Sequence, residues 1–369
     1  MTVPLVSVLL PVYNAEPYLA AAIESILRQD HQRLEIIAIN DGSRDRSLEI
    51  MQRYQQMDGR ITIVSRENRG LIATLNEGLA LAKGDLIARM DADDISYPSR
   101  LSRQVSLFVQ QPQLALCGTG IDTLLGDRII RGTPDPIYQP ASLRALSKFF
   151  TIFIHSTVVY NRHVIPQDML RYDAQYVHAE DFDLFRRVTD RFPAKMIDEA
   201  LIAYRIHGNS VTNMHKRQMR RTHLAIVAEN LERERLCDNP GALNHIGLAV
   251  TSETIRQAAT CIHSVEDRIS ALPPQTRKGY EAGALNLFYF LYQFVSDERR
   301  PELTHEFLTQ TGKWGLIRRR ERYGLITGAR APWCSRLSLA ATSRLDAWSR
   351  YRRSVPAASV LPLVGETLA

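Results

Sequence analysis

The first hundred residues alternate short apolar runs with amphipathic segments, and this alternation constrains the fold more than any other feature. The apolar runs are Leu5–Leu10, Glu35–Asn40, Ile61–Ser65 and Leu86–Met90. Between them, apolar residues recur at helical spacing in Pro17–Gln29, Asp45–Gln56 and Leu71–Ala82. Strand–helix alternation of this kind is typical of a parallel sheet with helices on both faces. We therefore predict an α/β fold for this part of the chain.

The alternation is less regular beyond Gln110, and helical periodicity dominates from about Met214. We expect strands at Leu114–Gly118, His155–Tyr160 and Lys195–Ile206, and a short helix at Glu180–Thr189. Further helices are predicted at Lys216–Leu236, Val250–Ala271 and Glu281–Ser296. The sequence thus predicts a sheet-containing domain over residues 1–214 and a helical C-terminal region with a basic tail over residues 215–369.

The 369 residues carry a net charge of +6, but this charge is concentrated at the C-terminal end. From Thr311 onward there are eleven Lys and Arg against three Asp and Glu, so the preceding residues have a net charge of −2. A basic patch limited to the tail does not favour a nucleic-acid-binding protein, and we expect no nucleic-acid partner. The cysteines are Cys117, Cys237, Cys261 and Cys334. They form no CxxC pair, which favours a reducing compartment and argues against a zinc site or a disulfide framework.

The N-terminal residues MTVPLVSVLLPVY are apolar but have no basic region and no small-residue cleavage site. Pro11 interrupts them, so we expect a strand there and no signal peptide. Because no stretch of about 18 consecutive apolar residues occurs, we also expect no membrane-spanning helix and a cytoplasmic protein.

Polar residues follow three of the predicted strands. They are Pro11–Asn14, Asn40–Ser43 and Asp91–Asp94. Ligands of open α/β sheets bind beyond the carboxyl ends of the strands, so we expect these loops to form one site. Asp91, Asp93 and Asp94 repel one another unless a cation or hydrogen-bond donors neutralise them. Two interpretations are open at this point: a solvated acidic loop, or a site for Mg²⁺ or Mn²⁺, which prefer carboxylate oxygens.

Four sequence blocks occur in an order and spacing that resemble a known family. They are VSVLLPVYNAEPYLAAAIESILRQ, EIIAINDGSRDRS, LNEGLALAKGDLIARMDADD and HAEDFDLFRRV, with YRIHGNSVT after them. By these motifs the chain resembles the family 2 glycosyltransferases with the GT-A fold, over roughly Val6 to Ser210. The resemblance implies that residues 1–214 form a GT-A, Rossmann-like catalytic domain that binds a nucleotide sugar.

The resemblance implies that Pro11, Tyr13 and Asp41 line the nucleotide pocket, with Asp91 on its diphosphate side. The chain departs from the family pattern at Asn40, where an aspartate is usual. An amide still offers a donor and an acceptor to a pyrimidine edge, so Asn40 remains a nucleotide-binding candidate. Tyr13 could stack on the base or could be a core residue.

By the same resemblance, Asp91 and Asp93 look like the metal and diphosphate aspartates, with Asp93 the direct ligand. His207 is similar to a residue that completes the metal site or closes over the diphosphate. The alternative for His207 is a structural histidine that follows a strand. Asp181 matches the catalytic base of the family. The structural alternative is that Glu180 and Asp181 only cap a helix.

The resemblance implies an inverting, metal-dependent glycosyltransferase that uses Mg²⁺ or Mn²⁺ and a nucleotide-diphosphate donor, with a UDP-sugar expected. The acceptor would be a saccharide or a lipid-linked molecule in surface polysaccharide synthesis. A nucleotidyltransferase shares the metal chemistry, and a non-catalytic nucleotide-sugar-binding module shares the fold, so both are open alternatives. A dinucleotide oxidoreductase is disfavoured because PVYNAEPY, the first strand–helix turn, contains no glycine.

The basic tail has two interpretations. From Trp333 to Trp348, apolar residues fall on one helical face and arginines flank it. Such a helix can lie in a membrane interface near a lipid-linked acceptor, which would give a peripheral membrane contact at the inner face. Alternatively, it packs on the protein and exposes a solvated basic face.

Overall fold

The computed structural model describes residues 3–133, 138–208, 214–319, 321–322, 325–326 and 353–361. These residues form two compact units. The first unit extends to Leu143 and from Thr151 to Met214, and the chain returns to it at Ser354. The second unit contains Arg144–Phe150 and the segment from His215 to Arg353. The chain thus passes from the first unit to the second at Met214. Two shorter segments are exceptions, because Arg144–Phe150 belongs to the second unit and the residues from Ser354 belong to the first.

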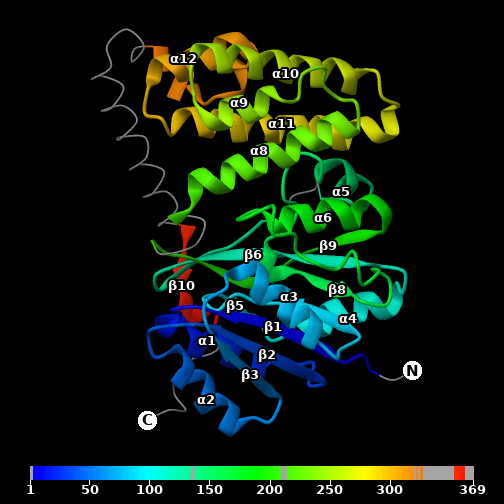
Figure 1. Cartoon of the computed structure of the whole chain (residues 1–369), viewed down its shortest axis with the longest axis vertical. Helices are drawn as coiled ribbons and strands as arrows, with labels where there is room; N and C mark the ends of the chain where they lie inside the picture. Colours follow the sequence, from blue (N-terminus) through cyan, green and yellow to red (C-terminus); the bar gives the residue numbers. More distant parts are fainter. Residues whose placement is uncertain are drawn as a thin grey trace. The chain divides into compact units, whose positions relative to one another are not determined.

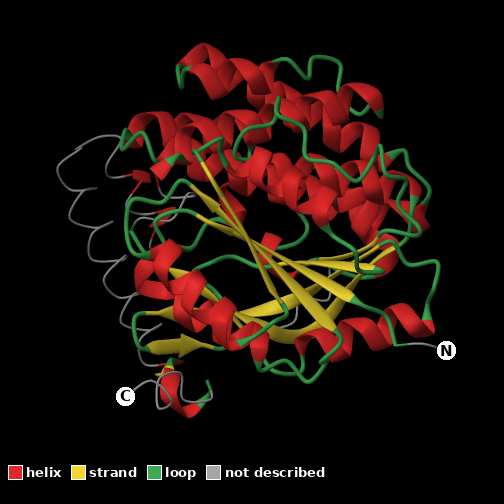
Figure 2. Cartoon of the chain, turned by 60° about the horizontal axis from the view of Figure 1, so that its bottom comes forward, coloured by secondary structure: helices red, strands yellow, loops and turns green. Residues whose placement is uncertain are grey.

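Four parallel strands form one end of the sheet in the first unit (Figure 1). They are β1 (Val6–Val12), β2 (Leu34–Asp41), β3 (Ile61–Arg66) and β4 (Leu86–Arg89). Their order is β4-β1-β2-β3, with Val6 opposite both Leu34 and Leu86. Val8, Leu10 and Ile36 are among the buried residues of the core on this sheet. The predicted α/β fold is confirmed, and Figure 2 shows the strands fanned into a twisted sheet.

Three helices lie where periodicity predicts them, namely α1 (Glu16–Leu27), α2 (Ser47–Met57) and α3 (Leu71–Leu81). Sequence analysis gave no range for the next helix, α4 (Arg100–Gln110). Asp45 and Ser47 both accept hydrogen bonds from backbone N–H groups at the start of α1. Asp45 also accepts one at the start of α2. The Ser47 hydroxyl accepts from the Ala15 N–H at 2.9 Å, and Asp45 accepts from the N–H groups of Glu16 and Ser47, each at 3.0 Å.

The remaining strands make the sheet mixed. They are β5 (Ile95–Ser96), β6 (Leu116–Leu125), β7 (Arg128–Ile130), β8 (Val159–Asn161), β9 (Ala194–Ile206) and β10 (Val355–Pro356). Strand β8 runs antiparallel to β4 and β6, whereas β9 runs parallel to β6. The register between β6 and β9 shifts on either side of Gly120. The helices α5 (Pro140–Leu146) and α6 (Glu180–Arg191) complete this part of the chain.

The strand predicted at His155–Tyr160 is only partly correct. His155–Thr157 forms a 3₁₀ turn, η1, and the strand begins at Val159. The Thr157 N–H and hydroxyl both donate to the carbonyl of Ile154, at 2.9 and 2.7 Å. A threonine hydroxyl that bonds to the local backbone competes with strand pairing, which explains the turn.

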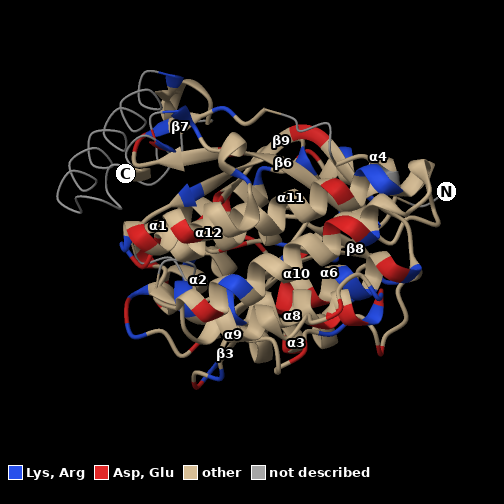
Figure 3. Cartoon of the chain, turned by 90° about the horizontal axis from the view of Figure 1, so that it is seen from above, with Lys and Arg blue, Asp and Glu red and all other residues tan. Residues whose placement is uncertain are grey.

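The second unit is helical, as predicted. Its helices include α8 (Lys216–Arg233), α9 (Ala242–Leu248), α10 (Ser252–Ser270), α11 (Pro274–Ser296) and α12 (Pro301–Thr311), followed by the 3₁₀ turn η2 (Trp314–Leu316). Thr251 caps α10 in a reciprocal pair with Thr254. Among the described helices, none is both long and apolar enough to cross a membrane. Figure 3 shows basic and acidic residues interspersed along the described elements.

The tail helix that the sequence suggested between Trp333 and Trp348 lies outside the described residues. After it, β10 pairs antiparallel with β7, with Val355 opposite Ile129, and the 3₁₀ turn η3 (Ala357–Ser359) follows. Sequence analysis did not predict this strand. The cysteines Cys237 and Cys261 are 24 residues apart in sequence, yet their Sγ atoms lie 3.0 Å apart as free thiols.

Candidate active site

Three carboxylates gather in the loop that follows β4. They belong to Asp91, Asp93 and Asp94. Each offers one carboxylate oxygen, and these three oxygens lie within 4.8 Å of one another. Burial raises the pKa of both Asp91 and Asp94, and the charge of Asp93 raises each of them further. A divalent cation would relieve this repulsion and offers the hard charge that carboxylate oxygens prefer. The donor set therefore fits Mg²⁺ or Mn²⁺.

Each carboxylate of this cluster also has a partner, and for Asp93 and Asp94 that partner comes from a distant part of the chain. Asp91 forms an ion pair with the buried Arg89. Asp93 Oδ2 lies 2.8 Å from Nε2 of His207, and Asp94 Oδ1 accepts the N–H of Arg205 at 2.8 Å. The structure thus brings the predicted metal candidates Asp91, Asp93 and His207 together.

Two residues that sequence analysis missed surround His207. The Tyr18 ring, from α1, lies 4.8 Å from the imidazole between ring centroids. The Arg205 guanidinium stacks 4.7 Å over the same Tyr18 ring, and its Nε donates to the backbone carbonyl of Asp93 at 2.7 Å. Arg205 belongs to the quoted YRIHGNS motif, so its place in the sequence was a usable signal. Tyr18 has no such signal, because tyrosine on an amphipathic helix is ordinarily a packing residue.

Asp181, the candidate base, is the second residue of α6. Its Oδ1 accepts the Phe182 N–H at 2.7 Å, and its Oδ2 lies 3.4 Å from the hydroxyl of Thr151. Burial raises the pKa of Asp181 to about 6, although its hydrogen bond from Phe182 and the charge of Arg89 act in the opposite direction. Burial and the charge of Asp181 raise the pKa of Glu180 to about 8. The N-cap position itself is Ala179, so neither carboxylate is the capping residue of the helix.

Arg89 is a buried cation that pairs with the acidic cluster and acts electrostatically on Asp181. Its side chain is only 2% exposed, it pairs with Asp91, and its charge lowers the pKa of both Glu180 and Asp181. Its Nε is buried without a hydrogen-bond partner among the described residues. Sequence analysis assigned no role to this arginine, because a basic residue at the end of a strand gives no signal about which distant carboxylates it faces.

The predicted nucleotide-binding residues lie at the ends of β1 and β2, and most of their polar atoms have partners. Asp41 accepts the N–H groups of Arg69 and Gly70 at 2.8 and 3.0 Å and forms an ion pair with Arg66. Gly70 has φ = 83°, a left-handed conformation that glycine adopts without strain and that aims its N–H at Asp41. This contact holds the start of α3 against the end of β2.

The amide of Asn40 is directed into the loop. Its Oδ1 accepts the Ser43 N–H at 3.0 Å, its Nδ2 donates to the Ser65 hydroxyl at 2.9 Å, and the residue is 3% exposed. Tyr13 is 50% exposed, so it is not a core residue. Pro11 is half-buried at the end of β1.

Comparison with known proteins identifies the family. A family model described as glycosyl transferase family 2 matches residues 7–168. An uncharacterized glycosyltransferase from Haemophilus influenzae is 32% identical over 238 residues, which are 62% of this chain and 73% of that protein. The chain belongs to glycosyltransferase family 2.

Further proteins are similar to this chain in sequence or in fold. The O-antigen biosynthesis glycosyltransferase WbnJ of Escherichia coli is 30% identical, over 56% of this chain and 81% of that protein. A crystal structure of S. aureus TarS residues 1–349 with UDP superposes with a TM-score of 0.51 at 16% identity, covering 76% of this chain and 90% of that one. The mannosyltransferase PcManGT of Pyrobaculum calidifontis, in complex with GDP-Man and Mn²⁺, gives a TM-score of 0.51 at 15% identity, covering 85% and 87%. These likenesses establish the GT-A fold of this family 2 glycosyltransferase.

Proposed function

We propose that this glycosyltransferase is inverting and metal-dependent, and that it transfers a sugar from a nucleotide-diphosphate donor, most simply a UDP-sugar. The observation that carries the proposal is the cluster of Asp91, Asp93 and Asp94, whose buried partner Arg89 also acts electrostatically on Asp181. Arg89 pairs with Asp91 of the acidic cluster, and its charge acts on Asp181. A metal-binding cluster and a general base then serve the same reaction at one edge of the sheet.

The roles follow from the chemistry of sugar transfer. As the bond between C1 and the phosphate oxygen breaks, its electron pair stays on the diphosphate. A bound Mg²⁺ or Mn²⁺, held by Asp93 and Asp91 with His207, would neutralise that charge as a Lewis acid. Pro11, Tyr13, Asn40 and Asp41 form the nucleotide end of the site, in which Tyr13 offers an exposed ring for stacking and Asn40 and Asp41 shape the loop.

Asp181 accepts the proton of the acceptor hydroxyl while that oxygen forms its bond to C1. The raised pKa suits this task, because a base with a pKa near the working pH combines ionisation with affinity for the proton. A single displacement from the face opposite the diphosphate inverts the configuration at C1. The name of WbnJ, which refers to O-antigen biosynthesis, supports a saccharide or lipid-linked acceptor in surface polysaccharide synthesis.

We further propose that residues 1–214 form the catalytic domain and residues 215–369 a helical C-terminal region whose basic tail contacts the inner face of the cell membrane. The passage of the chain from one compact unit to the other at Met214 supports this boundary, and the charge of the residues from Thr311 supports an anionic surface as partner. We propose a cytoplasmic location on the same grounds.

The proposal is tested by measuring the melting temperature with a panel of UDP-sugars and GDP-mannose, in Mn²⁺ and in EDTA. A ligand that binds only the native state raises the melting temperature, so the donor is expected to do so in Mn²⁺ and much less in EDTA. The product of transfer should show the inverted anomer by NMR. Binding without hydrolysis or transfer would favour the non-catalytic module instead, and no binding at all would contradict the proposal.

A further inference from the structure

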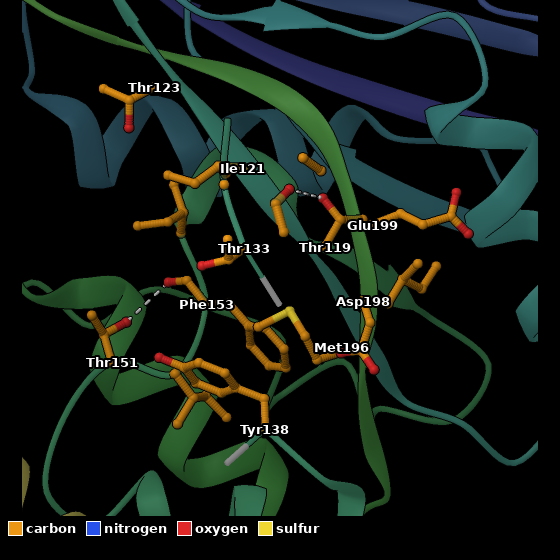
Figure 4. A pocket seen from close by; sticks show the side chains of 16 residues that line it. Thr119, Ile121, Thr123, Thr133, Tyr138, Thr151, Phe153, Met196, Asp198 and Glu199 are labelled. Atoms are coloured by element: carbon orange, nitrogen blue, oxygen red, sulfur yellow. Dashed lines mark hydrogen bonds between the residues drawn. The ribbon is translucent and has the colours of Figure 1, made fainter. Parts of the chain in front are cut away.

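A cavity of about 470 Å³ lies in the first unit beside the candidate base. Its wall is formed by β6, by the part of β9 from Met196 to Ala200, and by the segment from Thr151 to Ile154 (Figure 4). Thr133 and Tyr138 contribute from the loop that follows β7. The volume is in the range that holds small ligands in proteins, and none of the roles assigned above uses it.

Two residues connect this cavity to Asp181. Thr151 lines the cavity, and its hydroxyl lies 3.4 Å from Oδ2 of Asp181. Phe153 also lines it, and the Phe153 ring meets the Phe185 ring of α6 edge to face, with 5.5 Å between centroids. A molecule in the cavity would therefore lie one side chain away from the group that is proposed to deprotonate the acceptor.

The backbone around the cavity is shaped by two glycines of β6, Gly118 and Gly120. A Cβ at Gly118 would overlap the Phe153 ring, so only glycine lets that ring lie against β6. The register shift between β6 and β9 occurs at Gly120, next to Ala200 and Glu199 of the cavity wall. The irregular pairing of β6 and β9 thus shapes the wall of the cavity.

The lining combines hydroxyl groups with apolar and aromatic surface. Hydroxyls come from threonines on β6 and from Thr133 and Thr151, and apolar surface comes from Phe153, Met196 and neighbouring isoleucines. Among the described residues that line the cavity, none is Lys, Arg or His, and two are acidic, Asp198 and Glu199. Glu199 pairs with Arg103, whereas the Asp198 carboxylate has no partner among the described residues. Such a wall repels phosphate and suits a neutral ring with hydroxyls on its edge and C–H groups on its face.

We propose that this cavity binds a neutral pyranose ring of the acceptor, and that no phosphate of a lipid carrier enters it. The inference rests on the proposed function and makes it more specific, because it assigns acceptor recognition to a saccharide ring one side chain away from Asp181. The aromatic ring of Phe153 would pack on the sugar face, and Asp198 and the threonine hydroxyls would bond its hydroxyls. The ring belongs either to a free oligosaccharide or to the sugar end of a lipid-linked one.

The test uses saturation-transfer NMR with the methyl glycosides of glucose, galactose, mannose and N-acetylglucosamine as probes, and farnesyl phosphate as the phosphate-bearing alternative. At least one glycoside is expected to receive saturation from the wild-type protein. Thr133→Trp fills the cavity from an exposed loop position, and Asp198→Asn removes its unpaired charge without a change in size. Each should lower the glycoside signal about fivefold or more, whereas Asp168→Asn, at another exposed aspartate, should leave it unchanged.

The melting temperature of the same samples is also measured with nucleotide sugars and Mn²⁺. This measurement separates the inference from the proposed function. If the wild-type protein binds no nucleotide sugar, the proposed function is contradicted, whether or not a glycoside binds. A glycoside signal that persists in both folded cavity variants, or a wild-type signal from farnesyl phosphate that Thr133→Trp removes, would overturn the cavity assignment. A free trisaccharide and a lipid-linked one with the same sugar end then distinguish the two sources of the ring.

Discussion

Nε2 of His207 lies 2.8 Å from Oδ2 of Asp93, although 114 residues separate them in the sequence. The contact exists because β9 pairs with the short strand β5, with Ala203 opposite Ile95. This pairing places the residue after β9 beside the loop after β4. The acidic cluster and the histidine therefore form one group in the folded chain.

Removal of either partner of this contact should weaken metal binding. In Asp93→Asn we expect Mn²⁺-dependent nucleotide affinity to fall about 100-fold or more, and in His207→Gln about 10- to 100-fold, since each change removes an oxygen or nitrogen from a small donor set. Isothermal titration with nucleotide and Mn²⁺ measures the effect, with Asp168→Asn as the control. Unchanged affinity in folded Asp93→Asn would refute the ligand role.

Tyr18 is expected to position His207 by ring contact alone. Its ring lies 4.8 Å from the imidazole and 4.7 Å below the Arg205 guanidinium. Tyr18→Phe keeps both contacts and should retain Mn²⁺ affinity, whereas Tyr18→Leu should lower it about tenfold. Equal losses in the two variants would point to a role for the hydroxyl group instead.

Asp181→Asn should lower the rate of transfer about 10²–10⁴-fold while donor binding stays intact, because the amide cannot accept the proton. In the wild type, the rate should rise with pH through a midpoint near pH 6, where half of the carboxylate is ionised, and level off at higher pH. A rate–pH profile at saturating donor measures this midpoint. A profile that is flat between pH 5 and 8 would contradict the base assignment.

The carboxyl pair at the start of α6 should make the fold less stable as pH rises. The pKa of Asp181 is raised to about 6 and that of Glu180 to about 8, so between roughly pH 4 and 8 the folded state binds more protons than the unfolded state. The stability that these groups contribute is present at low pH and is lost as pH rises through those values. Urea unfolding of Glu180→Gln should show a smaller loss from pH 5 to 8 than the wild type. An equal loss in both proteins would show that Glu180 does not titrate in this range.

Gly118→Ala should destabilise the first unit, because the added methyl group overlaps the Phe153 ring. Overpacking of this kind costs about 1–3 kcal/mol in the free energy of unfolding. Gly59→Ala is the matched control, since a Cβ there meets nothing within 4 Å and the residue has no left-handed backbone. Denaturant unfolding compares the two, and equal stabilities would mean that Phe153 moves aside without cost.

Local sequence determined the parallel half of the sheet. The strands β1 to β4 and the helices between them are each set by the periodicity of neighbouring apolar residues, so their positions could be predicted to within a few residues. The loop motifs at the strand ends and the family resemblance follow from short stretches in the same way. The helices α8 and α10 also lie where their periodicity predicts them, whereas α11 ends as predicted but begins at Pro274, seven residues before the predicted start.

Tertiary structure alone decided which distant side chains meet. It placed Tyr18 against His207 and Cys237 beside Cys261, and it buried Arg89 where its charge lowers the pKa of Asp181. It also replaced the first part of the strand predicted at His155–Tyr160 by the 3₁₀ turn η1, and it paired β10 with β7. These features depend on contacts between residues that are far apart in the chain. Periodicity reports only which face of an element is buried, whereas the partner on that face is set by how all the elements pack together.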